Sequence, residues 1–202
     1  MWGRIVGRKA SIERRICISG TGRAGTTYLV QLFTALGFDT GADRLSYSEK
    51  ARAGLEFSIF DPMAPRVIKS PFLCDQIDAA LQAGIAIDHV VVPIRRLDHA
   101  AASRVLVQEI TTGQKDGPSV VGGLWDTQAA SDQERVLRDK LSTLIEALVR
   151  NDIPMTLLSF PRSATDARYT YGKLSHLMPC IGWKKFASTF YSVAKPNLIS
   201  FR

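Results

Sequence analysis

The residue types at positions 20–27, Gly-Thr-Gly-Arg-Ala-Gly-Thr-Thr, are those of a loop that binds phosphate. This glycine-rich loop follows a short apolar run at 16–18 and leads into residues 28–33, whose apolar spacing is typical of a helix. Glycines let a backbone approach a phosphate closely, and the N–H groups at a helix N-terminus donate hydrogen bonds to an anion. The sequence therefore predicts a strand, a loop and a helix that together bind a phosphorylated ligand.

The spacing of the glycine-rich loop also matches the nucleoside triphosphate-binding P-loop, G-x-x-x-x-G-K-[ST], with one exception. Thr26 occupies the position of the lysine that reaches the β and γ phosphates in that motif. The only cation within the loop is Arg23, whose planar guanidinium can bind an anion through two parallel hydrogen bonds. We therefore expect an anion shorter than a triphosphate.

This loop resembles the one in sulfotransferases that use 3′-phosphoadenosine 5′-phosphosulfate (PAPS), whose bacterial members commonly carry G-T-x-R-S-G-T-T. Only Ala24 departs from that pattern, in place of a serine. The resemblance implies PAPS as the cofactor, with no metal. It also implies that the 5′-phosphosulfate is bound by Gly22, Arg23, Ala24, Gly25, Thr26 and Thr27.

A second segment, residues 90–104, resembles the part of the same family that binds the 3′-phosphate. In the family an arginine at the end of a strand is followed eight residues later by a serine, and Arg95 and Ser103 reproduce this spacing, with Leu97 in place of the usual proline. The resemblance implies that Arg95 and Ser103 bind the 3′-phosphate. The alternative is an ordinary strand-to-helix junction with a solvated arginine pair and Asp98 capping the helix.

The proton of an acceptor hydroxyl must be removed as the oxygen attacks sulfur. Lys69 lies in a Lys-Ser-Pro segment similar to one that places a lysine beside the transferred group in many sulfotransferases, but the histidine base of some relatives is replaced by Pro71. Glu56 resembles a glutamate that bacterial sulfotransferases carry between the first helix and the second strand, and it is the leading candidate for the catalytic base. Glu49 and His99 are the other candidates, and a solvated carboxylate is the alternative role for Glu56.

The chain is predicted to alternate strands and helices. Strands are expected near 15–19, 66–69, 89–94 and 155–160, and helices near 26–36, 73–83, 98–111, 128–150 and 165–178. This pattern predicts an α/β fold, a P-loop three-layer α/β/α arrangement with a central parallel sheet, in a single domain over residues 1–202. The residues that follow the four strands include cations and no carboxylate, which argues against a magnesium-dependent kinase. They are Gly20, Lys69-Ser70, Arg95-Arg96 and Pro161-Arg162.

Two later segments have less specific patterns. Residues 115–125 are rich in glycine and predict a loop over the acceptor site, with Trp125 either anchoring that loop from the surface or stacking on a ligand. Residues 182–185 are similar to a G-x-W-K segment near the C-terminus of cytosolic sulfotransferases. An amphipathic helix with Phe186, Phe190 and Val193 packed inward explains them equally well.

Composition limits the remaining choices. The net charge of +7 invites a nucleic-acid partner, but no nucleic-acid-binding module is recognisable, and a polyanionic cofactor accounts for the basic residues as well. The three cysteines, Cys17, Cys74 and Cys180, are widely spaced and lie in apolar stretches of sequence. A disulfide scaffold or zinc site is therefore unexpected, and a reducing cytoplasm is favoured. The N-terminal residues lack the features of a signal peptide, and no membrane-spanning segment is expected.

Together these patterns predict a sulfotransferase that moves a sulfuryl group from PAPS to a hydroxyl or amine of a small-molecule or glycan acceptor. Two alternatives stay open: a P-loop kinase or nucleotide-binding protein that uses ATP, and a non-catalytic relative that binds the nucleotide only. The sequence contains no signature of the acceptor or of an oligomeric state.

Overall fold

The computed structural model describes residues 14–48, 51 and 53–199, and its centre is a four-stranded parallel sheet. The strands are β1 (Arg14–Ile18), β4 (Val67–Lys69), β5 (Ala86–Ile94) and β6 (Met155–Ser159). Their order across the sheet is β4-β1-β5-β6, and each neighbouring pair is parallel. All four predicted strands are present, within a few residues of the expected bounds.

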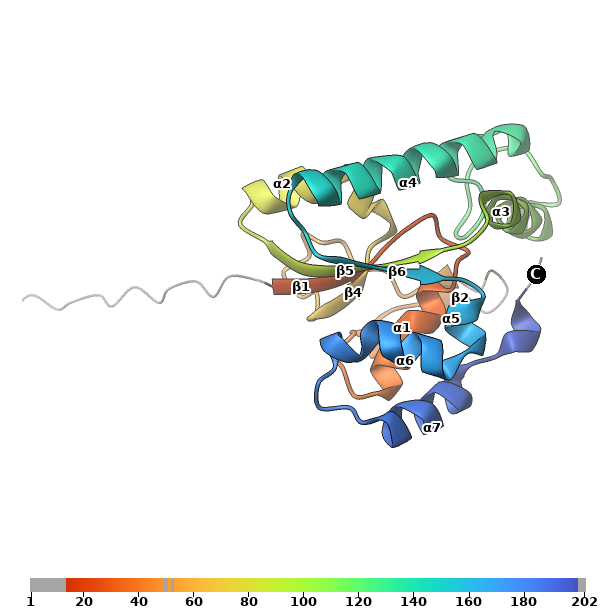
Figure 1. The fold of residues 1–202 in the computed structure, drawn as a ribbon. Coiled ribbons are helices and arrows are strands. Elements are labelled where there is room, and N and C mark those ends of the chain that lie inside the picture. Colours follow the sequence, from red (N-terminus) through yellow and green to blue (C-terminus); the bar gives the residue numbers. More distant parts are fainter. Residues whose placement is uncertain (1–13, 49–50, 52, 200–202) are drawn as a thin grey trace, which may run out of the picture.

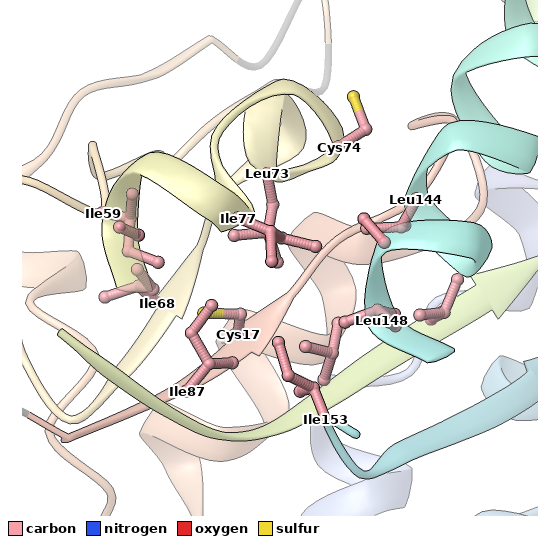
Figure 2. Close-up of a cluster of buried hydrophobic side chains, with 14 of the residues drawn as sticks. Cys17, Ile59, Ile68, Leu73, Cys74, Ile77, Ile87, Leu144, Leu148 and Ile153 are labelled. Carbon is pink, nitrogen blue, oxygen red and sulfur yellow. The ribbon is translucent and has the colours of Figure 1, made fainter. Parts of the chain in front are cut away.

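The sheet is covered on both faces, because its strands are apolar on both sides. Ile16 and Ile18 of β1 pack into one core, and Cys17 between them packs into the other. Figure 2 shows Cys17 and Ile87 of the sheet near Ile77 and Leu148 of the helices that cover this second core. Two buried faces are the expected property of a parallel sheet joined by helical crossovers.

Helices form the two outer layers (Figure 1). One face of the sheet carries α1 (Thr26–Ala35), α5 (Arg162–Thr165), α6 (Ala167–Leu174) and α7 (Trp183–Val193). The other face carries α2 (Ile77–Gln82), α3 (Leu97–Thr112) and α4 (Gln133–Arg150). The predicted α/β class, with a central parallel sheet in three layers, is confirmed.

Shorter elements connect these layers. A two-stranded antiparallel hairpin, β2 (Tyr47–Ser48) and β3 (Ala53–Gly54), lies outside the main sheet and was not expected from the sequence. Single 3-10 turns are η1 (Ala42–Arg44), η2 (Pro71–Asp75), η3 (Ala130–Asp132), η4 (Ser175–Leu177) and η5 (Pro196–Leu198).

Three predicted helices are shorter or divided. The helix expected at 73–83 is η2 followed by α2, because the backbone at Gln76 leaves helical geometry with φ −122°. The helix expected at 128–150 begins as α4 only at Gln133. The helix expected at 165–178 is interrupted by the extended Asp166, whose carboxylate caps α6 by accepting from the Tyr169 N–H at 2.9 Å.

The connections between strands diverge at one point of the sheet. The chain leaves β1 toward β4 on one side and leaves the adjacent β5 toward β6 on the other. Ligands in open α/β sheets bind in the crevice that such divergence creates beyond the carboxyl ends of the strands. The glycine-rich loop follows β1 and Arg95 follows β5, so both predicted binding segments flank this crevice.

Two expectations about composition can be compared with the structure. Cys17 and Cys74 are buried, but Cys180 is exposed, so the apolar surroundings expected for all three cysteines are found for two. In the described part of the chain, no helix is both long and apolar enough to cross a membrane.

Candidate functional site

The glycine-rich loop owes its shape to backbone angles that favour glycine. Gly20, Gly22 and Gly25 have φ angles of 135°, 66° and 83°, and Arg23 between them is also left-handed at 52°. Gly25 is the N-cap of α1, and a Cβ there would come within 2.8 Å of the Phe160 ring. Turns of this kind point successive N–H groups toward one side and form a concave site for an anion.

A cleft of about 630 Å³ opens at the carboxyl edge of the sheet beside this loop. Nine of the ten residues predicted for the site line the cleft: Gly22, Arg23, Gly25, Thr26, Thr27, Glu56, Lys69, Arg95 and Ser103. The tenth, Ala24, is fully buried beneath the loop. A serine at this position would therefore have its hydroxyl in the packed interior.

Arg23 connects the two predicted phosphate-binding segments. Its Nε donates to Ser103 Oγ at 3.1 Å, and its Nη1 donates to the Ala51 carbonyl at 2.7 Å. Arg95 Nη1 in turn donates to the Arg23 carbonyl at 2.9 Å. Arg95 also lies over the Phe160 ring, with its Cζ 5.4 Å from the ring centroid. Arg23, Arg95 and Ser103 thus form one hydrogen-bonded unit.

Lys69 and Glu56 form an ion pair at the edge of the same cleft. Lys69 Nζ lies 2.9 Å from Glu56 Oε1 and donates to Thr27 Oγ1 at 3.1 Å and to the Gly54 carbonyl at 2.9 Å. Burial lowers the pKa of Lys69, while the Glu56 carboxylate opposes that shift. The Glu56 side chain is 36% exposed, so its carboxylate contacts both the lysine and the solvent of the cleft.

Arg104 is a site residue that sequence reasoning missed. It belongs to α3, lines the cleft and is 8% exposed, and its guanidinium donates to the carbonyls of Thr21 and Gly123. Burial lowers the pKa of Arg104 to about 9, and the charge of Arg23 acts in the same direction. The available signal was an arginine directly after Ser103, in the helix that the Arg95/Ser103 spacing already placed at the sheet edge.

The charges in the cleft are strongly unequal. Among the described residues its lining contains a single carboxylate, that of Glu56. The basic side chains of the lining are Arg23, Lys69, Arg95, Arg104 and Lys195. Because several of these cations are buried and hydrogen-bonded to neutral groups, an anionic ligand is the natural counter-charge.

Part of the cleft lining is apolar and aromatic. It includes Tyr28 of α1, Tyr47 of β2, Val193 of α7, and Leu198. Among the described residues, the hydroxyl of Tyr28 is buried without a hydrogen-bond partner, and burial raises its pKa. A ligand suited to this cleft therefore has an anionic part and an apolar part.

Some predicted candidates lie elsewhere. His99 does not line the cleft, and its Nε2 is 4.0 Å from Asp98 Oδ2, which pairs with Arg96 on the surface. Glu49 falls outside the described residues. Trp183 begins α7 and packs against Tyr171 and Phe186 away from the cleft, in agreement with the amphipathic-helix alternative.

The C-terminal helix and the glycine-rich segment at 115–125 also differ in detail from expectation. Phe186 and Phe190 are buried in α7 as predicted, whereas Val193 is only partly buried and faces the cleft. Trp125 is not a surface residue, since it is 7% exposed, but it does anchor its segment. The backbone N–H of Trp125 donates to Gln133 Oε1 at 2.7 Å.

The described residues contain no group of three or more His, Cys, Asp or Glu side chains arranged to hold a metal ion. Comparisons of the chain with protein-family models, with curated proteins and with solved structures found no significant match. The function of the cleft therefore has to be argued from its own geometry.

Proposed function

We propose that this chain is a sulfotransferase that binds PAPS in the cleft beside the glycine-rich loop. The observation that carries the proposal is the convergence of four cations, Arg23, Lys69, Arg95 and Arg104, on one cleft. Within the part of the chain that the structure describes, the Glu56 carboxylate is the only one in the lining of this cleft. A cofactor with a 5′-phosphosulfate and a 3′-phosphate brings several negative charges in one molecule. The charge of the cleft and the charge of the cofactor are therefore complementary.

The residues present fit this cofactor. The left-handed backbone at Gly22, Arg23 and Gly25 suits a bound phosphosulfate, and a Cβ at Gly25 would meet Phe160. Arg95 and Ser103 are the residues that would hold the 3′-phosphate, and both are already joined to Arg23. Their link to the loop means that the two ends of the cofactor would be recognised by one hydrogen-bonded unit.

When bound, the cofactor supplies a sulfuryl group that moves from its 5′-phosphate oxygen to an acceptor oxygen or nitrogen. Glu56 is the base in this proposal, because its carboxylate reaches the cleft and can receive the acceptor proton. Lys69 keeps Glu56 in place through their 2.9 Å ion pair and adds positive charge beside Thr27. Arg23 and the N-terminus of α1 favour the negative charge that develops on the departing oxygen.

The acceptor would lie along the apolar wall formed by Tyr28, Tyr47, Val193 and Leu198. Such a wall shields the reacting atoms from water, which strengthens the interactions of the neighbouring cations. The chemical identity of the acceptor stays open between a small molecule and a glycan.

The proposal is tested by calorimetric titration of the full chain with adenosine 3′,5′-bisphosphate and, separately, with ATP plus magnesium. We expect the bisphosphate to bind, and Arg95→Ala to weaken it by more than about tenfold, since a buried hydrogen bond to a charged group contributes about 1.5–3 kcal/mol. The matched control is Arg150→Ala, which removes an arginine of α4 that pairs with Asp78 of α2, and this variant should bind as the unmodified chain does.

The other outcomes identify the alternatives. Unchanged affinity in Arg95→Ala would remove Arg95 from the 3′-phosphate site. A preference for magnesium-ATP would favour a P-loop kinase or other ATP-binding protein. Tight bisphosphate binding, with no sulfuryl transfer from PAPS to any of a panel of phenols, alcohols, amines and sugars, would favour a non-catalytic nucleotide-binding protein.

A further inference from the structure

Arg104 occupies a position between two parts of the cleft that are far apart in sequence. Its Nε and Nη2 both donate to the Thr21 carbonyl, at 3.2 and 2.9 Å, and its Nη1 donates to the Gly123 carbonyl at 2.7 Å. Thr21 belongs to the glycine-rich loop, and Gly123 belongs to the segment between α3 and η3, residues 113–129, which we term the roof segment. A single guanidinium therefore joins the anion-binding loop to the roof segment.

The glycine-rich loop packs directly on this guanidinium. A Cβ at Gly22 would come within 2.5 Å of Arg104 Nη2, so the backbone at Gly22 can approach the arginine only because it lacks a side chain. Gly122 of the roof segment is close to the side chain of Arg23 from the loop, since a Cβ at Gly122 would lie 3.5 Å from Arg23 Nη1. The roof segment thus approaches Arg23 at Gly122 and accepts a hydrogen bond from Arg104 at the next residue, Gly123.

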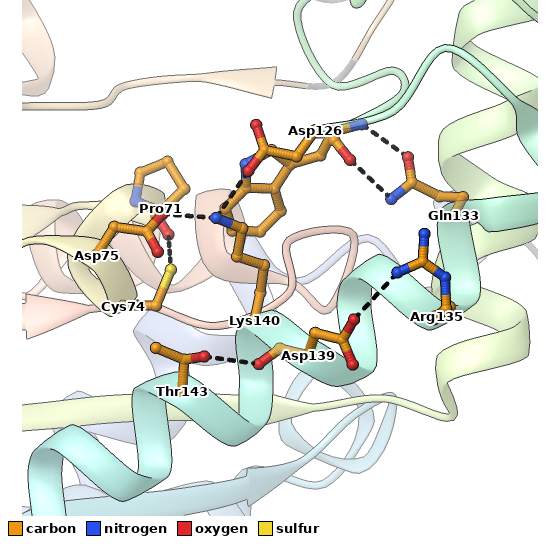
Figure 3. Close-up of polar contacts among 10 residues, drawn as sticks. Pro71, Cys74, Asp75, Asp126, Gln133, Arg135, Asp139, Lys140 and Thr143 are labelled. Atoms are coloured by element: carbon orange, nitrogen blue, oxygen red, sulfur yellow. Dashed lines mark hydrogen bonds and ion pairs between the residues drawn. The ribbon is translucent and has the colours of Figure 1, made fainter.

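The roof segment has its own anchor on α4. The backbone N–H of Trp125 donates to Gln133 Oε1 at 2.7 Å, and Gln133 Nε2 donates to the Trp125 carbonyl at 3.3 Å. Lys140 of α4 reaches Asp126, next to Trp125, as Figure 3 shows. The Trp125 ring lies over Arg104, with its centroid 5.0 Å from the Arg104 Cζ. A change in the position of Arg104 would therefore alter its contact with the Trp125 ring.

The charge of Arg104 is the reason to expect a response to ligand. Its guanidinium donates hydrogen bonds to carbonyl oxygens, and among the described residues it forms no ion pair with a carboxylate. Burial disfavours its charged form, and the nearby Arg23 adds like-charge repulsion. An anion bound at the glycine-rich loop would relieve both effects and so strengthen the hydrogen bonds that Arg104 makes.

We propose that Arg104 is a positioning residue that couples anion binding at the glycine-rich loop to the placement of the roof segment over the cleft. The inference rests on the proposed function, in that the loop binds the anionic part of the ligand. This coupling is reciprocal: if a bound anion stabilises the placement of the roof segment, then the placed roof segment strengthens anion binding by the same factor. A variant that loosens the roof segment should therefore weaken anion binding. Trp125, which does not line the cleft, then affects ligand affinity through Arg104.

A double-mutant cycle tests this coupling, with the dissociation constant of adenosine 3′,5′-bisphosphate as the readout. The variants are Arg104→Met, Trp125→Leu and the double variant. We expect Trp125→Leu to weaken binding about threefold to tenfold in the presence of Arg104 and to have almost no effect in the Arg104→Met background. Equal effects in both backgrounds, or no effect of Trp125→Leu in either, would overturn the proposal.

Controls separate coupling from general damage. Arg168→Met removes another arginine that stacks on a tryptophan, Trp183, with its Cζ 4.5 Å from the ring, but outside the cleft, and it should leave affinity unchanged. Cooperative thermal unfolding shows whether each variant is folded. If Trp125→Leu does not fold, Gln133→Met loosens the same anchor by removing its two hydrogen bonds to Trp125.

Inorganic pyrophosphate as a second probe distinguishes failure of the coupling from failure of the proposed function. Pyrophosphate binding that shows the non-additive cycle, without bisphosphate binding, would support the coupling and contradict the PAPS proposal. Bisphosphate binding with an additive cycle would contradict the coupling and support the PAPS proposal. Absence of binding by both probes would overturn both.

Discussion

Two sets of basic side chains in this molecule differ in the groups that they contact. On the exposed side of α4, basic residues pair with carboxylates, as in Arg138 with Glu134 at 2.7 Å and Arg150 with Asp78 at 3.0 Å. In the cleft, Arg104 is buried and donates to backbone carbonyls. A helix surface can satisfy its charges locally with neighbours at i±4 or with water, whereas buried cations without matching carboxylates need a partner from outside.

This contrast explains why charge alone was ambiguous in the sequence. The net charge of +7 is a sum over both regions and does not distinguish them. The exposed pairs contribute little to stability, because each is screened by solvent. Among the described residues, the basic side chains that line the cleft outnumber its carboxylates, and this excess is the part of the charge that indicates a ligand.

The largest effect is expected from removing the central cation of the cleft. Arg23→Gly is compatible with the left-handed backbone at this position, where φ is 52°, and removes the side chain whose guanidinium joins Ser103 and the Ala51 carbonyl. We expect adenosine 3′,5′-bisphosphate binding to weaken about 10- to 100-fold, from the loss of about 1.5–3 kcal/mol of charge-assisted hydrogen bonding. Calorimetry measures the loss, and Arg138→Ala on α4 is the control. A Kd equal to that of the unmodified chain would mean that the cleft does not use Arg23 for the anion.

A smaller effect of opposite sign is expected from Glu56, whose carboxylate is the only one that the described residues contribute to the cleft lining. Glu56→Gln removes a negative charge that competes with the ligand for Lys69, so bisphosphate binding should become a few-fold tighter. If Glu56 is also the base, sulfuryl transfer from PAPS should fall by about 10²–10⁴-fold in the same variant. Glu134→Gln on α4 should change neither quantity. Tighter binding with unchanged turnover would leave Glu56 a counter-ion only.

The smallest effect concerns the paired region and its response to acid. Hydrogen bonds from Asn151 and Arg150 hold the pKa of Asp78 below its usual value of 3.8. Since the folded-state pKa is the lower one, the stabilisation is complete above pH 3.8 and is lost as the pH falls through the folded-state value. Asp78→Asn should therefore show a slightly flatter decline of melting temperature below pH 3.8 than the unmodified chain.

The control for Asp78→Asn is a variant of another exposed aspartate. Asp43→Asn changes an exposed carboxylate on η1, away from α4, and its melting temperature should follow the unmodified chain across the same pH range. Bisphosphate affinity at neutral pH should be the same in both aspartate variants. An altered affinity in Asp78→Asn would contradict the separation between the two sets of cations.

Much of the fold was predictable because its signals are local. The apolar run at 16–18, the glycines of the loop and the apolar spacing of the first helix identified a strand, a turn and a helix without tertiary information. The boundaries that failed, at Gln76 and Asp166, are places where a few residues leave helical geometry between two helical stretches. The short hairpin β2/β3 has only two residues in each strand, too few for a periodic pattern.

The candidate site was predictable in membership but not in contacts. Strand exits identified Lys69 and Arg95, yet the same rule also selected Arg96 and Arg162, which the structure places in surface pairs with Asp98 and Asp166. Neighbours in sequence at the end of a strand point to opposite sides, so residue type alone does not say which of two arginines enters the cleft.

The sequence by itself determined the glycine-rich loop, the order of strands and helices, and the excess of basic residues, because each depends on residue type and short-range spacing. The tertiary structure decided that Arg23 contacts Ser103, that Glu56 pairs with Lys69, and that Arg104 joins Thr21 to Gly123. Those contacts connect residues from 13 to 83 positions apart. They form only when the crossovers bring the carboxyl ends of separate strands, and the loops that follow them, to one edge of the sheet.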